Sequence, residues 1–509
     1  MKVIKLENVS CKIGSKVLLE DISVDFSEGS CWAITGPNGS GKSLLAMIMG
    51  GALKESSGKV VLEGNTGYAS FELQQKIMAD ERRVDNSRFM QGGIDPGTKV
   101  KDFILKNRGS DETLFLEYIS MFNLEKILAR GLRYLSTGEF RKIMLCRALM
   151  AKPDILIVDD PFDGLDVSAQ KNLQQLFKTL VESDERIFLV TPRKSEIPEW
   201  ADHVLELDEG RVKYAGKYAA KYQGKIPGRT AFEGWGREAS DRLLPHENPS
   251  AFAHLAGSDL SDDAVTAAGK NRPPVISMKN VFLSYENEKI LSDINWEVQK
   301  GEKWKITGPN GCGKSTLISL VNADNPKAYM NDITLFGIKK GSGETIWDIK
   351  KKIGFVSGDF QMNYRVRSTL LDTVLSGFFD SIGLYSEVSG LQLEEALSWI
   401  DVSGMMDKKN VPFKELSFGE KRKALIMRAL VKMPELIILD EPCQGLDEEN
   451  TSSVIDIIEK LASLAESTIL LVSHSININP KGFNNHLTFK THPEGGYTAV
   501  TSPSREWRG

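Results

Sequence analysis

ITGPNGSGKS, at residues 34–43, recurs almost unchanged as ITGPNGCGKS at residues 306–315. Both stretches fit the pattern G-x-x-x-x-G-K-[S/T], in which a glycine-rich turn joins an apolar strand to a helix. Glycine is needed because the turn must point its N–H groups inward, where the helix N-terminus helps them to bind phosphate. Two copies in the same context predict two phosphate-binding loops, P-loop one and P-loop two, in one chain.

Each P-loop also carries side chains suited to a nucleotide. The lysine is predicted to reach the β- and γ-phosphates, and the serine after it to bind Mg²⁺. The residues predicted to bind nucleotide are Gly36, Pro37, Asn38, Gly39, Ser40, Gly41, Lys42 and Ser43, and Gly308, Pro309, Asn310, Gly311, Cys312, Gly313, Lys314, Ser315 and Thr316.

The repeat extends beyond the two loops. Gly36 and Gly308 are 272 residues apart, whereas LSTGE at 135–139 and LSFGE at 416–420 are 281 apart, so the second copy holds about nine extra residues between these blocks. Residues 216–272 are rich in Gly, Ala, Ser and Pro, without periodicity and with nearly cancelling charges. We predict a first domain at 1–215, a linker at 216–272 and a second domain at 273–509.

Composition narrows the class of protein. The 509 residues carry 64 Lys+Arg and 69 Asp+Glu, a net charge of −5, and no clear nucleic-acid-binding feature. Five scattered cysteines without a C-x-x-C pair argue against a disulfide framework or a metal cluster and favour a reducing cytosol. The apolar runs are far shorter than a membrane span, so we expect a cytoplasmic chain with no transmembrane segment.

Each copy has the same expected order of elements. Alternating strands, at 4–9 and 17–26 and again at 275–283 and 290–298, precede a buried strand, the P-loop and a helix. After LS-x-GE comes a helix, at 141–150 and 421–431, and then an apolar strand that ends in acids. This order predicts an α/β core with an inserted helical segment. At the ends of the apolar strands, Asp159 and Asp440 are predicted to hold Mg²⁺ through water.

P-loop, LS-x-GE signature, acid-tipped strand and a GLD turn (164–166, 445–447) occur twice in that order. In this the chain resembles the ATP-binding cassette (ABC) superfamily over nearly its whole length outside the linker. The resemblance implies two α/β P-loop ATPase domains, each with an antiparallel β subdomain and a helical signature subdomain, that bind ATP and Mg²⁺. It also implies an intramolecular cassette dimer, in which each ATP lies between one P-loop and the other signature. Ser417 and Gly419 would then face P-loop one, and Ser136 and Gly138 P-loop two.

The catalytic positions of the family differ between the copies. The resemblance assigns the orientation of the attacking water to Glu441 and His474 in copy two. In copy one, Asp160 and Pro192 stand at those places. The adenine-stacking aromatic corresponds to Tyr285 in copy two and to Ile13 in copy one. We therefore expect P-loop two to hydrolyse ATP, and P-loop one to bind it and turn over slowly or not at all.

Several stretches narrow the resemblance, including YLSTGEFRKIMLCRALM at 134–150 and SGFFDSIGLY at 376–385. They resemble the ModF group of tandem ATPases, named molybdate-transport ATP-binding proteins or photorepair proteins. That implies a cytosolic ATPase of an importer, docking to membrane permease subunits supplied in trans on the inner membrane. No residue here recognises molybdate, and neither GYASFE at 67–72 nor IGFVSGD at 353–359 supplies the glutamine with which the family senses its permease.

Three functions remain open from the sequence. The first is an importer motor, for molybdate or, as an alternative, for a sugar. The second is a soluble ribosome-associated ATPase, although the linker lacks the long charged helix of such factors. The third is an ATPase of DNA repair or regulation, which rests on the photorepair name alone.

Overall fold

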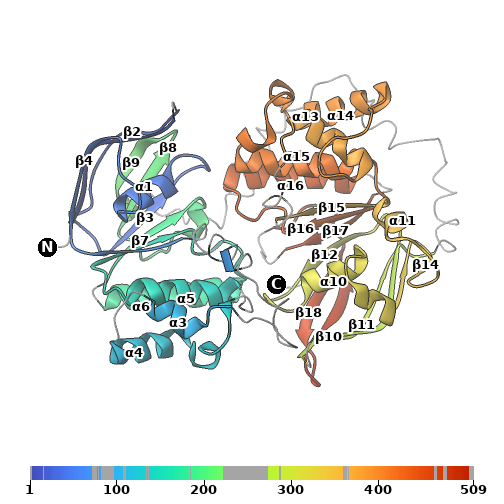
Figure 1. Cartoon of the computed structure of the whole chain (residues 1–509), viewed down its shortest axis with the longest axis horizontal. Coiled ribbons are helices and arrows are strands. Elements are labelled where there is room, and N and C mark those ends of the chain that lie inside the picture. The colour runs from blue at the N-terminus through green and yellow to red at the C-terminus, as the bar shows by residue number, and fades with distance from the viewer. Residues whose placement is uncertain are drawn as a thin grey trace. The chain divides into compact units, whose positions relative to one another are not determined.

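The computed structural model describes residues 3–14, 16–70, 77, 80–81, 97–106, 111–132, 135, 137–183, 185–221, 273–285, 288–358, 361, 364, 366–463, 467–473 and 478–503. The chain divides into two compact units, Met1–Arg242 and Leu243–Gly509, and each is described by itself (Figure 1). Residues 222–272 of the predicted linker lie outside the described part. The linker therefore stays a prediction.

Unit one contains two sheets. The three-stranded antiparallel sheet has the order β2-β1-β4, and the six-stranded sheet the order β5-β6-β7-β3-β8-β9. The strands are β1 (Val3–Ile13), β2 (Lys16–Asp25), β3 (Cys31–Thr35), β4 (Ser57–Glu63), β5 (Thr66–Ser70), β6 (Ile155–Asp159), β7 (Arg186–Thr191), β8 (His203–Asp208) and β9 (Arg211–Lys217). The helices are α1 (Lys42–Met49), α3 (Val100–Leu105), α4 (Glu112–Phe122), η2 (Glu125–Ile127), α5 (Thr137–Leu149), α6 (Val167–Glu182), η4 (Lys194–Glu196) and α7 (Tyr218–Lys221).

The central strands of unit one are apolar throughout because helices or a sheet cover both faces. On β6, Leu156 and Val158 pack into one core with α3 to α6, whereas Ile155 and Ile157 pack into another with α1, β1 and β2. Figure 1 shows the same layers, with α3 to α6 on the opposite side of β7 from α1.

Unit two repeats this plan with all ten strands in one sheet, of order β14-β13-β10-β11-β19-β18-β12-β17-β16-β15. The strands are β10 (Ile276–Tyr285), β11 (Glu288–Val298), β12 (Lys303–Thr307), β13 (Asp332–Leu335), β14 (Ile338–Lys339), β15 (Ile353–Ser357), β16 (Leu436–Asp440), β17 (Thr468–Val472), β18 (Asn485–Thr491) and β19 (Tyr497–Pro503). The helices are α10 (Lys314–Val321), η7 (Pro326–Met330), α11 (Ile346–Lys350), α13 (Leu370–Leu375), η8 (Ser376–Phe379), α14 (Gly390–Val402), η9 (Met406–Lys408), η10 (Phe413–Glu415), α15 (Phe418–Leu430) and α16 (Glu448–Ser463).

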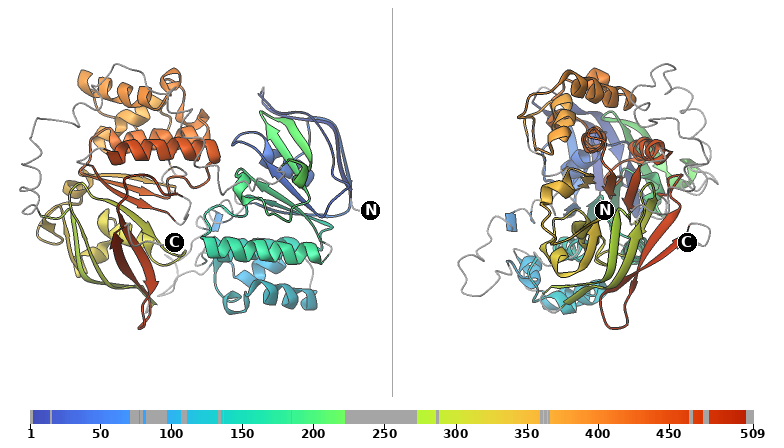
Figure 2. Two further views of the ribbon diagram at one scale, coloured as in Figure 1. Left: turned by 180° about the vertical axis from the view of Figure 1, so that it is seen from behind. Right: turned by 90° about the vertical axis from the view of Figure 1, so that its right-hand side faces the viewer.

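The α/β class with a β subdomain and a helical subdomain in each copy is confirmed. The antiparallel strands are longer than expected, since β1 and β10 run to Ile13 and Tyr285. The signature blocks also begin their helices earlier than expected, at Thr137 and Phe418. Figure 2 shows the helical subdomain of unit two, α13 to α16, beside its sheet from two further directions.

Candidate nucleotide-binding sites

Both P-loops have the turn that the sequence predicts, between a buried strand and a helix. Gly36 and Gly41 in P-loop one have φ values of 146° and 93°. A Cβ on Gly36 would lie 2.0 Å from the carbonyl oxygen of Leu207, and one on Gly41 would lie 2.4 Å from Leu19 Cδ2. Any larger residue would therefore displace β8 or β2 and open the loop.

The P-loop lysines lie inside their own loops. Lys42 Nζ donates hydrogen bonds to the carbonyl oxygens of Gly36 and Pro37, at 2.8 and 2.6 Å. Lys314 Nζ does the same to Gly308 and Pro309, at 2.8 and 3.0 Å. Each ammonium is thus held at the hollow of the turn, where a phosphate oxygen is a stronger acceptor than a neutral carbonyl.

The predicted Mg²⁺ carboxylates lie at the correct edge of each sheet. One strand, β7 or β17, separates the P-loop strand from the strand that ends in Asp159 or Asp440. All three are parallel, so their carboxyl ends lie along one edge. Asp159 is buried and accepts a hydrogen bond of 3.2 Å from the Tyr68 hydroxyl on β5. Tyr68 was missed because it is far from Asp159 in the sequence and lies beside it only through the pairing of β5 with β6.

The next residue, Asp160 or Glu441, has the same backbone in both units. Both lie in the left-handed region, with φ values of 53° and 51°. Their N–H groups donate to the carbonyl oxygens of Val190 and Val472, at 2.9 and 3.0 Å. The two sites therefore differ here in the side chain alone, which is one methylene shorter in Asp160.

Strand pairing also aligns the residues after β7 and β17. Asp159 pairs with Val190, and Asp440 pairs with Val472. Pro192 and His474 follow these partners by two residues each, so they correspond to each other in the sequences of the two copies. His474 itself lies outside the described residues, and its role stays a prediction.

Unit one has a charged network at this edge that the sequence analysis missed. Arg193 Nη1 lies 2.9 Å from Glu196 Oε1, and its Nη2 lies 3.5 Å from Asp163 Oδ1. Thr191 Oγ1 donates to the other oxygen of Glu196. Asp163 and Glu196 are buried. Arg193 thus joins the loop after β7 to the turn after β6.

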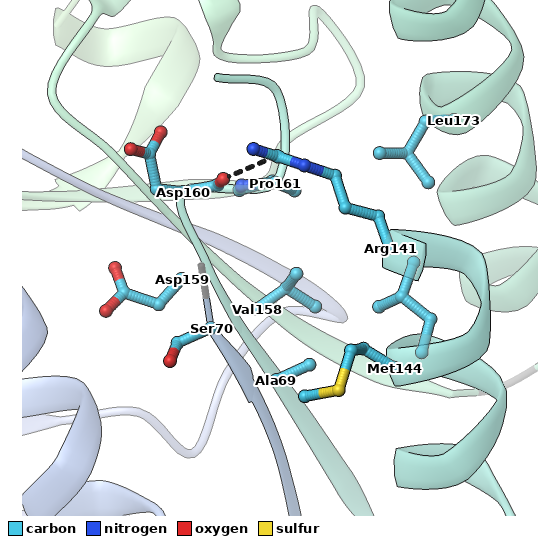
Figure 3. Close-up of a pocket in the computed structure, with 10 residues that line it drawn as sticks. Ala69, Ser70, Arg141, Met144, Val158, Asp159, Asp160, Pro161 and Leu173 are labelled. Carbon is cyan, nitrogen blue, oxygen red and sulfur yellow. Dashed lines mark hydrogen bonds between the residues drawn. The ribbon is translucent and has the colours of Figure 1, made fainter. Parts of the chain in front are cut away.

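Arg141 on α5 holds the same turn from the other side. Its guanidinium donates to the backbone carbonyl of Asp160 at 2.8 Å and to that of Asp163. Figure 3 shows the carboxylates of Asp159 and Asp160 pointing away from Arg141, on the side of Ser70. Arg141 therefore holds the backbone of Asp160 from the side opposite to its carboxyl group.

The environment of Asp160 raises the pKa of its carboxyl group well above the ordinary value. Burial is the main cause, and the negative charges of Asp163 and Glu196 act in the same direction, against the two arginines. The efficiency of a general base depends on its pKa, so this environment affects what Asp160 can do as a proton acceptor.

Tyr285 and Ile13 are the last residues of β10 and β1, as the alignment of the copies predicts. The Tyr285 ring is 43% exposed. Asn325 donates to its hydroxyl at 2.9 Å, and Lys327 Nζ lies 4.3 Å from the ring centroid. Unit two therefore holds an oriented aromatic ring at the surface, and unit one has an aliphatic residue at this place.

The signature serine and glycine of copy two lie at the start of α15. Ser417 caps the helix, because its Oγ accepts the N–H of Glu420 and the Glu420 carboxylate accepts the N–H of Ser417. A Cβ on Gly419 would lie 2.1 Å from Asn450 Oδ1 on α16. In copy one, Gly138 lies in the first turn of α5, and Ser136 lies outside the described residues.

Gln361 is a polar residue of unit two that the sequence analysis missed. It is buried four residues after β15, and its Nε2 donates to the carbonyl oxygen of Phe418 at 3.1 Å. Its Oε1 has no hydrogen-bond partner among the described residues. Gln361 was missed because it lies beyond residues 353–359, the stretch in which a glutamine was expected.

Two phosphate-binding loops, each with an acid-tipped strand and a signature helix, define an ATPase with two nucleotide-binding domains. A family model described as ABC transporter matches residues 19–163 and 291–444, one match in each unit. The chain belongs to this ABC transporter family, and it is an ATPase. Within the described residues, no helix has the length and apolarity needed to cross a membrane.

The chain is similar to several whole proteins of this family. It is 40% identical over 477 residues, 92% of both chains, to the ABC transporter ATP-binding protein ModF of Escherichia coli (strain K12). It is 27% identical over 473 residues, 90% of this chain and 91% of the other, to an uncharacterized ABC transporter ATP-binding protein of Schizosaccharomyces pombe.

Among solved structures, the chain is similar to the archaeal ribosome recycling factor aABCE1, in its complex with the ribosomal stalk protein aP1. The TM-score is 0.56, with 20% identity over 98% of this chain and 90% of that one. This likeness shows the tandem fold alone.

Proposed function

We propose that the two units of this ATPase form two composite ATP sites of unequal activity. P-loop two, with the signature of copy one, hydrolyses ATP. P-loop one, with the signature of copy two, holds ATP and turns it over slowly or not at all. The observation that carries this proposal is the contrast at one backbone position, where Glu441 in unit two corresponds to Asp160, with its raised pKa, in unit one.

In the active site, each residue has a separate task. Lys314 would bind the β- and γ-phosphates, and Ser315 and Asp440 would hold Mg²⁺, which neutralises charge on the phosphate oxygens. Glu441 would accept the proton of the attacking water, and His474 would help to orient that water. Tyr285 would stack on the adenine ring.

In the holding site, the binding groups are present and the catalytic groups are changed. Lys42, Ser43 and Asp159 match their counterparts in unit two. Asp160 is one methylene shorter than Glu441 and has a raised pKa, and Pro192 has no side-chain donor or acceptor. Such a site binds ATP·Mg²⁺ and lacks the means to activate water.

We further propose that ATP turnover energises or regulates an ABC importer through permease subunits supplied in trans. The relative named ModF supports this reading through 40% identity over nearly its whole length. Molybdate as the cargo rests on the resemblance alone. The second candidate is an ATPase that acts on ribosomes or in DNA repair, for which the likeness to a ribosome recycling factor supplies the fold only.

The partner can be identified by trapping the ATP-bound state. We expect Glu441→Gln in the full chain, purified from its own cells with ATP, to retain membrane permease subunits. The matched control is Glu441→Gln with Lys314→Ala, which should bind no ATP at P-loop two and should release the partner. Ribosomal subunits or DNA in place of permease subunits would contradict the importer proposal and favour the second candidate.

A further inference from the structure

The helical subdomain of unit two contains an insertion that unit one lacks. Lys99 pairs with Gly131, 32 residues later, and the equivalent Thr369 pairs with Pro412, 43 residues later, so copy two is eleven residues longer here. Most of the difference lies between α13 and α14, where residues 376–389 replace the shorter connection between α3 and α4. We call residues 376–389 the insert.

The insert is anchored to the subdomain by two basic side chains of α15 and the residues after it. Arg428 Nε donates to Ser376 Oγ at 3.1 Å, and its Nη2 donates to the carbonyl oxygen of Ser381 at 2.9 Å. Lys432 Nζ pairs with the carboxylate of Asp380. Apolar side chains of the insert pack against the helical core as well, namely Phe378, Leu384 and Val388. These contacts fix the course of the insert.

In the insert and in the turn of α14 that follows it, several large apolar side chains are exposed to solvent. Tyr385 and Leu391 are each 80% exposed, Ile382 is 52% exposed and Leu393 is 39% exposed. Leu391 and Leu393 belong to the first turn of α14, and Ala396, Trp399 and Ile400 of the same helix pack into the core. Figure 1 shows α13 and α14 on the far side of α15 from the sheet of unit two. Large aromatic and aliphatic side chains exposed on an ordered surface are typical of binding sites.

The sequence of this segment carries charges of one sign. Residues 381–402 contain no Lys or Arg, and their four carboxylates belong to Glu387, Glu394, Glu395 and Asp401. The neighbouring Lys432 is already paired with Asp380. Such a surface repels nucleic acid, anionic lipid and an identical copy of itself, and it attracts a basic partner.

We propose that the insert and the first turn of α14 form a docking surface for a basic, amphipathic segment of a partner polypeptide. Leucine-like side chains of that segment would pack on Tyr385, Leu391 and Ile382, and its Lys or Arg residues would pair with Glu387 and Glu394. The site belongs to unit two alone, and it lies outside the residues that bind or hydrolyse ATP.

The test is site-specific photo-cross-linking in the full chain, produced at its native level in its own cells. The photoreactive amino acid p-benzoylphenylalanine replaces Tyr385, and in the control it replaces Leu116, an exposed apolar residue of α4 in the unit without an insert. We expect an adduct from position 385 only. Mass spectrometry should map it to a segment of another protein with net positive charge and apolar residues on one helical face.

The affinity between the purified chain and a synthetic peptide with the sequence of the mapped segment is then measured. Glu387→Lys combined with Glu394→Lys should weaken binding at least fivefold, and Leu391→Ala should weaken it about tenfold, with ATP turnover unchanged. The proposal is overturned by no adduct from position 385, by equal adducts from both positions, or by an adduct with an acidic segment, nucleic acid, lipid, this chain itself or a second copy. Unchanged peptide affinity in the variants also overturns it.

Discussion

At the scale of the residue, the two units differ in the surroundings of the carboxyl group that follows the acid-tipped strand, which is Asp160 in unit one and Glu441 in unit two. Asp160 lies beside Asp163 and Glu196, which Arg193 neutralises within the protein. In unit two, Gln444 and Ile478 occupy the places of the two neighbouring acids. Unit one thus has an ion network at the position where we propose a catalytic pair in unit two.

Removing Arg193 should destabilise unit one strongly. Arg193→Met leaves the buried carboxylates of Asp163 and Glu196 without their main partner, at a cost of about 2–4 kcal/mol in the free energy of unfolding. The measurement is urea unfolding, followed by hydrogen exchange at β7. Arg211→Met is the matched control, since the fully exposed pair of Arg211 with Glu20 should contribute little to stability. Equal losses in the two variants would show that the network is not structural.

At the scale of the element, the two signature helices begin in different surroundings. A Cβ at Gly419 would lie 2.1 Å from Asn450 Oδ1, whereas one at Gly138 would lie 3.7 Å from Leu165. Asn450 cannot move away easily, because its side chain and its N–H both bind Asp447, each at 2.8 Å. Only the start of α15 therefore requires glycine on steric grounds.

An alanine substitution should affect stability differently at the two positions. Gly419→Ala should cost about 1–3 kcal/mol of unfolding free energy through overpacking against α16. Gly138→Ala meets only ordinary contacts, and helix propensity should make it neutral or stabilising by up to about 1 kcal/mol. Thermal unfolding of the two variants, resolved by hydrogen exchange at α5 and α15, tests this. A stable Gly419→Ala variant would contradict the close contact.

Strand β12 carries a basic residue in the core, where the equivalent strand β3 has Ala33. Lys305 is fully buried, between Leu471 and His486 on the neighbouring strands. Burial lowers the pKa of Lys305 to about 8. Burial also lowers the pKa of His486, and the charge of Lys305 acts in the same direction.

This pKa predicts a pH dependence of stability. In the unfolded chain a lysine titrates near pH 10.4, so between about pH 8 and pH 10 the unfolded state binds more protons and stability rises with pH. Lys305→Met should remove this part of the rise, on the order of 1–2 kcal/mol, and should raise the pKa of His486. Urea unfolding at pH 7 and pH 9.5 and NMR titration of His486 measure the two effects. Lys279→Met, at an exposed position of β10, should change neither.

At the scale of the whole molecule, the sequence was sufficient for the duplicated architecture. The P-loops, the acid-tipped strands and the signature blocks are local patterns, and their repetition predicted two α/β units with helical subdomains. The predicted P-loop residues and strand-end acids that the structure describes lie at the ends of strands and the starts of helices, and their roles stay predictions. Each P-loop lysine also lies inside its own loop.

The sequence did not predict features that depend on contacts between distant segments. Arg193 pairs with Asp163, which follows another strand. Gln361 donates a hydrogen bond to Phe418, at the start of a helix that lies far along the chain. The change of offset between the copies indicated about nine extra residues. The bridge pairs place an eleven-residue insertion in the helical subdomain. Small length differences elsewhere between the P-loop and the signature block reduce the net difference to nine.

The central claim is that the two ATP sites are unequal, and the most direct test is steady-state ATP turnover of matched variants. Glu441→Gln should lower kcat by about 100-fold or more, because it removes the proton acceptor of the active site. Asp160→Asn should leave kcat within about twofold of the unchanged chain. The claim would be contradicted if Asp160→Asn or Lys42→Ala abolished turnover while Glu441→Gln left most of it.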